Sequence, residues 1–89
     1  MLGLTDSLRE MSGRADLPIL IDQEGGRVAR LRPPLVAAYP PMGLYGDMLA
    51  ADQARAIEAA RLGEALLAHD LYELGINIDC APCLDVRLP

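Results

Sequence analysis

Residues 17–31 read LPILIDQEGGRVARL, a short apolar run followed at once by charged residues and two glycines. A continuous apolar run such as residues 17–21 is typical of a strand that is buried on both faces, as in parallel sheets. Pro18 lies near the start of the run, where the loss of one backbone N–H is tolerated. The run therefore predicts a parallel strand, and the polar residues after it lie where such folds gather their ligand contacts.

Two carboxylates follow the predicted strand directly. In extended backbone Asp22 and Glu24 point to the same side, because alternate residues of a strand share a face. Gly25 and Gly26 permit a positive φ and the close approach of other groups. The two carboxylates are too close in sequence to be assigned as the acid and the nucleophile of a glycosidase, which stand about 5–9 Å apart across a bound sugar.

Two arginines complete this segment. Arg27 and Arg30 each offer a planar fork of hydrogen-bond donors, so a pocket for a polar ligand such as a sugar is one hypothesis. The structural alternative is that Glu24 and Arg27 form an internal ion pair and that Asp22 caps a turn. The residue types alone favour the structural alternative.

The remaining elements are predicted from apolar spacing and turn residues. Helical spacing predicts a short helix over residues 4–12 and the main helix over 51–74, whereas the prolines and glycines of 31–47 predict an irregular loop. A second strand is predicted over 76–81. The order helix, strand, loop, helix, strand is typical of an α/β chain with parallel strands and helices outside them.

Cap residues predict where the short helix begins and ends. Ser7 and Glu10 have the spacing of a capping box, and Gly13 is expected to end the helix.

The main helix has its own cap candidates. Asp47 or Asp52 is expected to cap its first turn, and Gly75 suits the position after its last turn. Small and apolar residues recur at steps of three or four and predict its inner stripe, which Ala59, Leu62 and Leu66 widen: Ala56, Ala60, Gly63, Leu67, Leu71 and Leu74.

A second segment, GINIDCAPCLDV over residues 75–86, contains the second predicted strand. Residues 21–31 closely resemble the signature of glycoside hydrolase family 3 in its β-N-acetylhexosaminidase branch, and residues 75–86 look like the family's following strand with its Ala-Pro-x-x-Asp ending. The Pro40-Pro41-Met42 turn and the long helix between the two segments also match in order and spacing. The resemblance covers nearly the whole chain.

The resemblance implies roles for individual residues. Asp22 matches an Asp whose carboxylate holds hydroxyls of the non-reducing-end N-acetylglucosamine, and Arg30 matches an Arg that contacts the substrate. Asp85 matches an Asp near the rim of the pocket. Four further residues match positions that shape the pocket in this family: Glu24, Gly25, Gly26 and Arg27.

The resemblance also implies a fold and a mechanism. Residues 1–89 would be a fragment of one N-terminal barrel domain, a partial (β/α)8 TIM barrel with two parallel strands, one long helix and a short N-terminal helix. The family uses a retaining mechanism with an Asp nucleophile from a late strand and a His acid/base on a mobile loop, and neither lies in this chain. A complete barrel takes about 250 residues. The chain is therefore expected to supply substrate-binding residues and to be inactive by itself.

The implied activity is removal of terminal β-linked N-acetylglucosamine from muropeptide-like sugars during bacterial peptidoglycan recycling. No metal and no organic cofactor is implied. A β-glucosidase-like member is the alternative within the family, and the string DQEGGRV-x-R argues against it.

Composition limits the other classes of function. The net charge is −5 and the basic residues are scattered arginines, so the concentrated positive charge that nucleic acid requires is absent. No apolar run approaches the roughly 18 residues of a membrane span, and the N-terminal residues lack the pattern of a signal peptide. A cytoplasmic location and no membrane partner are therefore expected.

Cys80 and Cys83 have the C-x-x-C spacing of thioredoxin-like redox sites, so a small thiol-redox protein is the alternative outside this class, and a non-catalytic remnant is a third. A redox site needs its first thiol at a helix N-terminus, and the residues that follow are a poor helix start. His69 is the one histidine, too few for a zinc site, and is expected to be solvated or locally paired. Tyr39 and Tyr45 are expected to pack the Pro-rich loop rather than to stack on a sugar.

Overall fold

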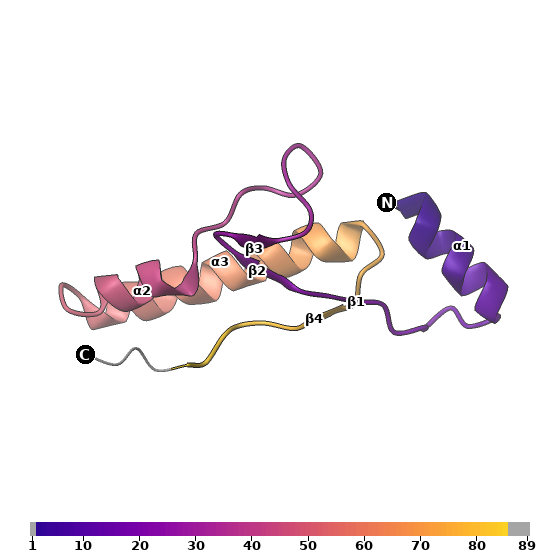
Figure 1. Ribbon diagram of the computed structural model, residues 1–89. Helices are drawn as coiled ribbons and strands as arrows, with labels where there is room; N and C mark the ends of the chain where they lie inside the picture. The colour runs from indigo at the N-terminus through magenta and orange to yellow at the C-terminus, as the bar shows by residue number, and fades with distance from the viewer. Residues whose placement is uncertain (1, 86–89) are drawn as a thin grey trace.

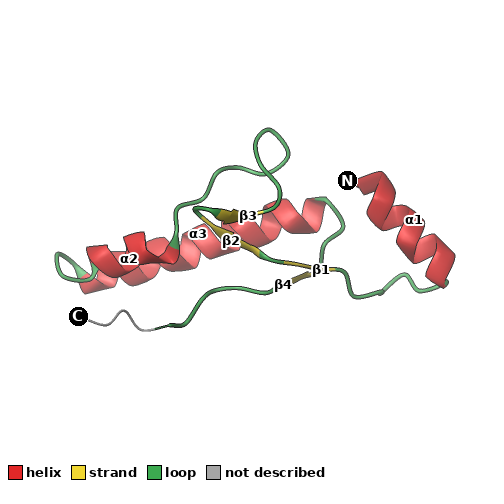
Figure 2. Ribbon diagram, viewed as in Figure 1, coloured by secondary structure: helices red, strands yellow, loops and turns green. Residues whose placement is uncertain are grey.

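The computed structural model describes residues 2–85 and arranges them as helices beside two small sheets (Figures 1 and 2). The helices of this part are α1 (Leu2–Ser12), α2 (Met42–Met48) and α3 (Gln53–Glu73). The strands are β1 (Leu20–Ile21), β2 (Gln23–Gly25), β3 (Val28–Ala29) and β4 (Ile78–Asp79). Within these residues, every helix is too short or too polar to cross a membrane.

The two predicted strands pair in parallel, as the order of elements indicated. β1 and β4 are in register at Leu20↔Ile78 and Ile21↔Asp79, and the connection between them runs through α3. The described chain is thus an α/β arrangement with a β–α–β unit at its centre.

Both strands are shorter than predicted. Ahead of β1, the side chain of Asn77 takes the place of the backbone ladder: its Oδ1 accepts from the Ile19 N–H at 2.8 Å and its Nδ2 donates to the Leu17 carbonyl at 3.3 Å. Leu20 is 58 % exposed, so the prediction of a strand buried on both faces is wrong for the described residues. α3 covers one face of this pair, and no described element covers Leu20.

α3 begins and ends close to the predicted positions. Asp52, rather than Asp47, caps it: the Asp52 carboxylate accepts from the Arg55 N–H at 3.0 Å. Gly75 follows the helix with a φ of +84°. The prediction that Leu62 and Leu66 widen the inner stripe is wrong, because both are exposed, whereas Leu67 and Leu71 are buried and Ala59 is half-buried.

α1 already begins at Leu2, so the capping box predicted at Ser7 and Glu10 is wrong; Ser7 lies inside the helix. Gly13 ends the helix with a φ of +71°, as expected. The buried hydroxyl of Thr5 donates to the Leu74 carbonyl at 2.9 Å and joins α1 to the end of α3.

Two elements were not predicted. Residues 42–48 form α2 instead of continuing the irregular loop, and residues 23–29 form the antiparallel hairpin β2–β3. The apolar core is small and lies between α3, the loop and the residues just before β4, at Val36, Leu67, Leu71 and Ile76.

Candidate functional site

The segment that carries the charged residues projects from the C-terminal end of β1. Asp22 is the single residue between β1 and β2, and the chain then folds back through the turn Gly26–Arg27 into β3 (Figure 2). The hairpin therefore presents residues 22–30 at the edge of the parallel pair where ligand contacts were expected.

The structure brings Asp22 and Arg30 together. An Nη of Arg30 lies 3.8 Å from a carboxylate oxygen of Asp22, and both side chains are more than half exposed. The alternative ion pair between Glu24 and Arg27 is not formed within this described hairpin. A carboxylate and a guanidinium thus face solvent side by side at the end of β1, which is a donor and acceptor set suited to sugar hydroxyls.

Gln23 follows Asp22 in the chain, but its side chain lies on the other side of the hairpin from Asp22 and Arg30 and is 2 % exposed. Its Oε1 accepts from the Arg30 N–H at 2.8 Å and from the Leu31 N–H at 3.0 Å, and its Nε2 donates to the Leu31 carbonyl at 2.7 Å. The sequence interpretation missed this residue. The alternation that places Asp22 and Glu24 on one face would have placed Gln23 on the other.

Asp79 of β4 completes the support of this segment. Its Oδ1 accepts from the Gln23 N–H at 2.9 Å. Burial raises the pKa of Asp79, and the nearby Glu24 and Asp22 carboxylates raise it further, against the lowering effect of the Gln23 N–H. Burial also raises the pKa of Glu64, and Asp79 and Glu24 add to it. Carboxylates from three elements therefore converge beside β2.

The glycines of the hairpin have the predicted backbone freedom. Gly25 and Gly26 have φ values of +110° and +59°. A Cβ on Gly25 would lie 3.2 Å from the carbonyl carbon of Pro40, and the Gly26 N–H donates to the Tyr39 carbonyl at 2.8 Å. The glycines therefore allow the Pro-rich loop to pass directly against the hairpin.

A cavity of about 810 Å³ lies on the α2 side of the hairpin. Glu24, Gly25, Arg27 and Asp85 line it together with residues of α2 and α3, whereas Asp22, Gly26 and Arg30 do not. Val86, the last residue of the second motif, lies outside the described residues. The structure thus places the candidate pocket-shaping residues, except Gly26, around one hollow.

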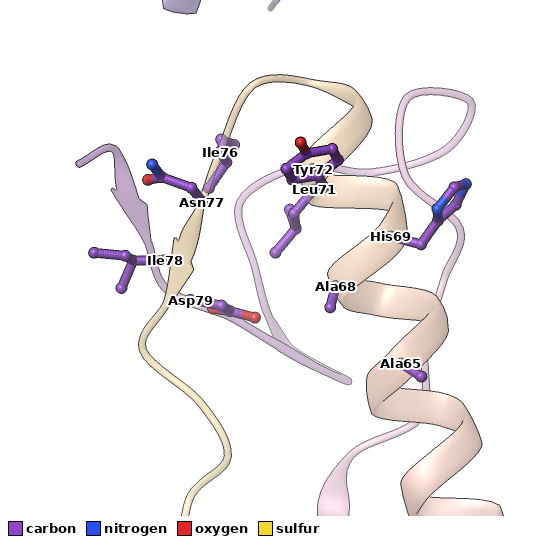
Figure 3. A pocket seen from close by; sticks show the side chains of 9 residues that line it. All are labelled: Ala65, Ala68, His69, Leu71, Tyr72, Ile76, Asn77, Ile78 and Asp79. Atoms are coloured by element: carbon purple, nitrogen blue, oxygen red, sulfur yellow. The ribbon is translucent and has the colours of Figure 1, made fainter. Parts of the chain in front are cut away.

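A second cavity, of about 400 Å³, lies between α3 and β4 (Figure 3). Its walls are mostly apolar, from residues such as Ala65, Leu71 and Ile76. The Nε2 atom of His69 lies 3.8 Å from a carboxylate oxygen of Glu73 and both side chains are exposed, which agrees with the prediction of a solvated or locally paired histidine.

The cysteines lack the features of a redox pair. Cys80 and Cys83 are free and exposed, and no helix begins in the described residues that follow them. Partial removal from water raises the pKa of the Cys80 thiol, and the negative charge of Asp22 and a hydrogen bond to it raise the pKa further. A reactive thiolate requires the opposite shift, so these observations do not favour the redox alternative.

Tyr39 of the loop and Tyr45, which lies in α2, both pack against α3. The Tyr39 hydroxyl donates to Asp70 at 2.6 Å, and the Tyr45 hydroxyl lies against Gly63. Among residues 2–85, no group of three or more histidine, cysteine or acidic side chains is arranged to hold a metal ion.

The chain is similar to β-hexosaminidases. It is 35% identical over 83 residues to a β-hexosaminidase of Xanthomonas axonopodis pv. citri, and 34% identical over 85 residues to one of Thioalkalivibrio sulfidiphilus. Each alignment covers 93% of this chain and 24% of the relative. A β-hexosaminidase of Aromatoleum aromaticum is 36% identical over 70 residues, which are 79% of this chain and 20% of the relative.

The chain spans about a quarter of the length of these curated relatives. No protein-family model and no solved structure matches it. The names of the relatives support a relationship to glycoside hydrolases.

Proposed function

We propose that this chain is the early, sugar-binding part of a cytoplasmic glycoside hydrolase of family 3, in the β-N-acetylhexosaminidase branch. The complete enzyme would remove terminal β-linked N-acetylglucosamine, with muropeptide-like sugars of peptidoglycan recycling as its substrates. The similarity to the hexosaminidase relatives supports the activity, and the parallel β1–β4 pair is compatible with a piece of a (β/α)8 barrel.

The observation that carries the proposal is the exposed pair of Asp22 and Arg30 at the end of β1. A carboxylate can accept hydrogen bonds from two neighbouring sugar hydroxyls, and a guanidinium can donate to ring substituents in a fixed plane. The pair is held at a strand end but is open to solvent, so a sugar can reach both groups. Glu24, Arg27 and Asp85 would shape the adjoining hollow.

In the proposed mechanism this chain binds and orients the terminal sugar. The nucleophilic Asp and the acid/base His of a retaining reaction would come from polypeptide corresponding to the rest of the relatives. We therefore expect the 89-residue chain to bind the sugar without cleaving it.

The test is a titration of the ¹⁵N-labelled chain with the methyl β-glycosides of N-acetylglucosamine and of glucose. Asp22→Asn and Arg30→Met should each weaken binding of the N-acetylglucosaminide by about tenfold or more, since each removes a charged hydrogen-bond partner. Asp16→Asn and Arg14→Met are matched controls, because these residues form an exposed ion pair at 3.2 Å in the segment between α1 and β1, outside the hairpin.

Loss of binding in the first two variants and not in the controls would support the proposal. Absence of binding by the parent chain, or equal binding by all four variants, would contradict it. Tighter binding of the glucoside than of the N-acetylglucosaminide would favour the β-glucosidase-like alternative over the hexosaminidase hypothesis.

A further inference from the structure

We infer that Gln23 is a positioning residue, which holds Arg30 beside Asp22 and so sets the geometry of the sugar-binding pair. The inference deepens the proposed function and rests on it. Gln23 does not face the ligand; it acts on the opposite side of the hairpin, through the backbone of Arg30.

The backbone pairing of the hairpin alone does not fix Arg30. The β2–β3 register joins Gln23 to Ala29 and Gly25 to Val28, with an irregularity between them, and Arg30 lies one residue beyond the last pair. At this point the Gln23 side chain replaces the ladder, because its Oε1 accepts from the N–H groups of both Arg30 and Leu31.

The amide group suits this place chemically. Its oxygen meets two donors and its nitrogen meets the Leu31 carbonyl, so donor and acceptor are both used inside a buried site. A methionine side chain has similar length and no comparable hydrogen-bonding groups, and would leave partly buried backbone groups of Arg30 and Leu31 without this partner.

Asp79 fixes the backbone of Gln23 itself. It accepts from the Gln23 N–H, so β4 fixes the backbone of Gln23 while the Gln23 side chain fixes the backbone of Arg30. The parallel β1–β4 pair is thereby connected to the backbone of Arg30, which carries the exposed guanidinium, through two hydrogen bonds.

The experiment compares the full chain with Gln23→Met, and uses Gln53→Met on the exposed first turn of α3 as the control. Amide hydrogen exchange of Arg30 and Leu31 should accelerate about tenfold or more in Gln23→Met, whereas exchange of the Cys80 N–H, which bonds to the Ile21 carbonyl in the β1–β4 pair, should change little. Affinity for the methyl N-acetylglucosaminide should fall about fivefold or more. Gln53→Met should alter neither quantity.

A double-mutant cycle separates positioning from a general structural effect. If Gln23 acts through Arg30, then Gln23→Met adds no further loss of affinity in the Arg30→Met background. An additive loss, or unchanged affinity in the single variant, would overturn the inference.

Two readouts keep this test distinct from that of the proposed function. If the parent chain binds no sugar, the proposed function fails, while the exchange rates still report whether Gln23 holds Arg30. If the Gln23→Met variant does not fold, amide exchange in the parent chain is the test. The inference would be overturned if the Arg30 and Leu31 N–H groups exchange as fast as open loop amides. Protection comparable to that of the Cys80 N–H would support it.

Discussion

The phenol of Tyr39 connects the Pro-rich loop to α3 through its 2.6 Å hydrogen bond to Asp70. Burial raises the pKa of Tyr39 to about 12 from its ordinary 10.0, and the bond to Asp70 and the charge of that carboxylate add to the shift. Because the pKa is higher in the folded chain than in the unfolded one, Tyr39 stabilises the fold below pH 10, and this contribution is lost as the pH rises through about 12.

We therefore expect Tyr39→Phe to flatten the decline of unfolding free energy between pH 10 and pH 12. Urea unfolding at a series of alkaline pH values measures this decline. Tyr72→Phe is the control for loss of one phenol, since Tyr72 is 73% exposed on α3. An equally steep decline in Tyr39→Phe and in the parent chain would contradict the assignment.

The candidate site was predictable to the extent that it depends on local order. Asp22 and Arg30 could be named from the motif, and their position after a parallel strand follows from the apolar run that precedes them. Their 3.8 Å approach depends on the hairpin that returns the chain, and the hairpin depends on contacts of Gln23 with residues 30, 31 and 79. Such contacts have no periodicity that a sequence can display.

At the scale of the elements, α2 packs on α3 through a tyrosine and a glycine. The Tyr45 hydroxyl occupies the space where a side chain on Gly63 would lie. Overpacking in Gly63→Ala should cost about 1–3 kcal/mol, against a helix gain of about 0.5–1 kcal/mol from removing a glycine, so we expect a net destabilisation of about 1–2 kcal/mol.

The double variant Gly63→Ala with Tyr45→Phe removes the colliding hydroxyl and should recover much of this loss. Denaturant unfolding measures all three variants. Gly46→Ala in α2 is the control, because a Cβ there meets open space, and it should stabilise the chain slightly. A double variant no more stable than Gly63→Ala would show that the hydroxyl does not control the packing of α2.

Helices were predicted better than strands, for a physical reason. α3 carries its signals locally, in the Asp52 cap, the spacing of Leu67 and Leu71, and Gly75. The length of β1 is set by a side chain 58 residues away, that of Asn77. The hairpin has a local signal in its glycine-containing two-residue turn. Its charged residues, however, do not show the apolar pattern from which a strand is predicted. Gly43 and Gly46 are poor helix formers, and for this reason the sequence did not predict α2.

The molecule as a whole is extended for its length. Its radius of gyration is 15.2 Å and its dimensions are 49 × 25 × 22 Å, where a compact chain of this size would have a radius of about 12 Å. Its accessible surface of 6401 Å² exceeds the roughly 5,100 Å² of a folded monomer of equal mass. Much apolar surface therefore stays in contact with water.

Part of that surface is an open sheet face. Leu20 and Ile78 are neighbours in register, are 58% and 42% exposed, and Figure 3 shows Ile78 directed away from α3. Exposed apolar residues on a sheet with unpaired edges favour association. We expect the chain to self-associate with rising concentration, and more strongly at high salt, which screens the net charge of −5.

Light scattering coupled to size-exclusion chromatography measures this association. Leu20→Lys should shift the chain toward monomer, whereas Leu84→Lys, an equally apolar position that is 84% exposed outside the sheet, should have a smaller effect. A parent chain that stays monomeric at all concentrations would contradict the prediction.

The close passage of the Pro-rich loop over Gly25 and Gly26 has a consequence for protein engineering. The hairpin and the loop up to Pro41 fit each other through backbone, with no room for a methyl group at Gly25. Grafting residues 22–30 onto another scaffold would remove the surface that shapes their turn. A transplant would therefore need residues 22–41 as one block, a recipient strand that supplies an aspartate in the place of Asp79, and a helix that replaces the contacts of Val36 and Tyr39 with α3.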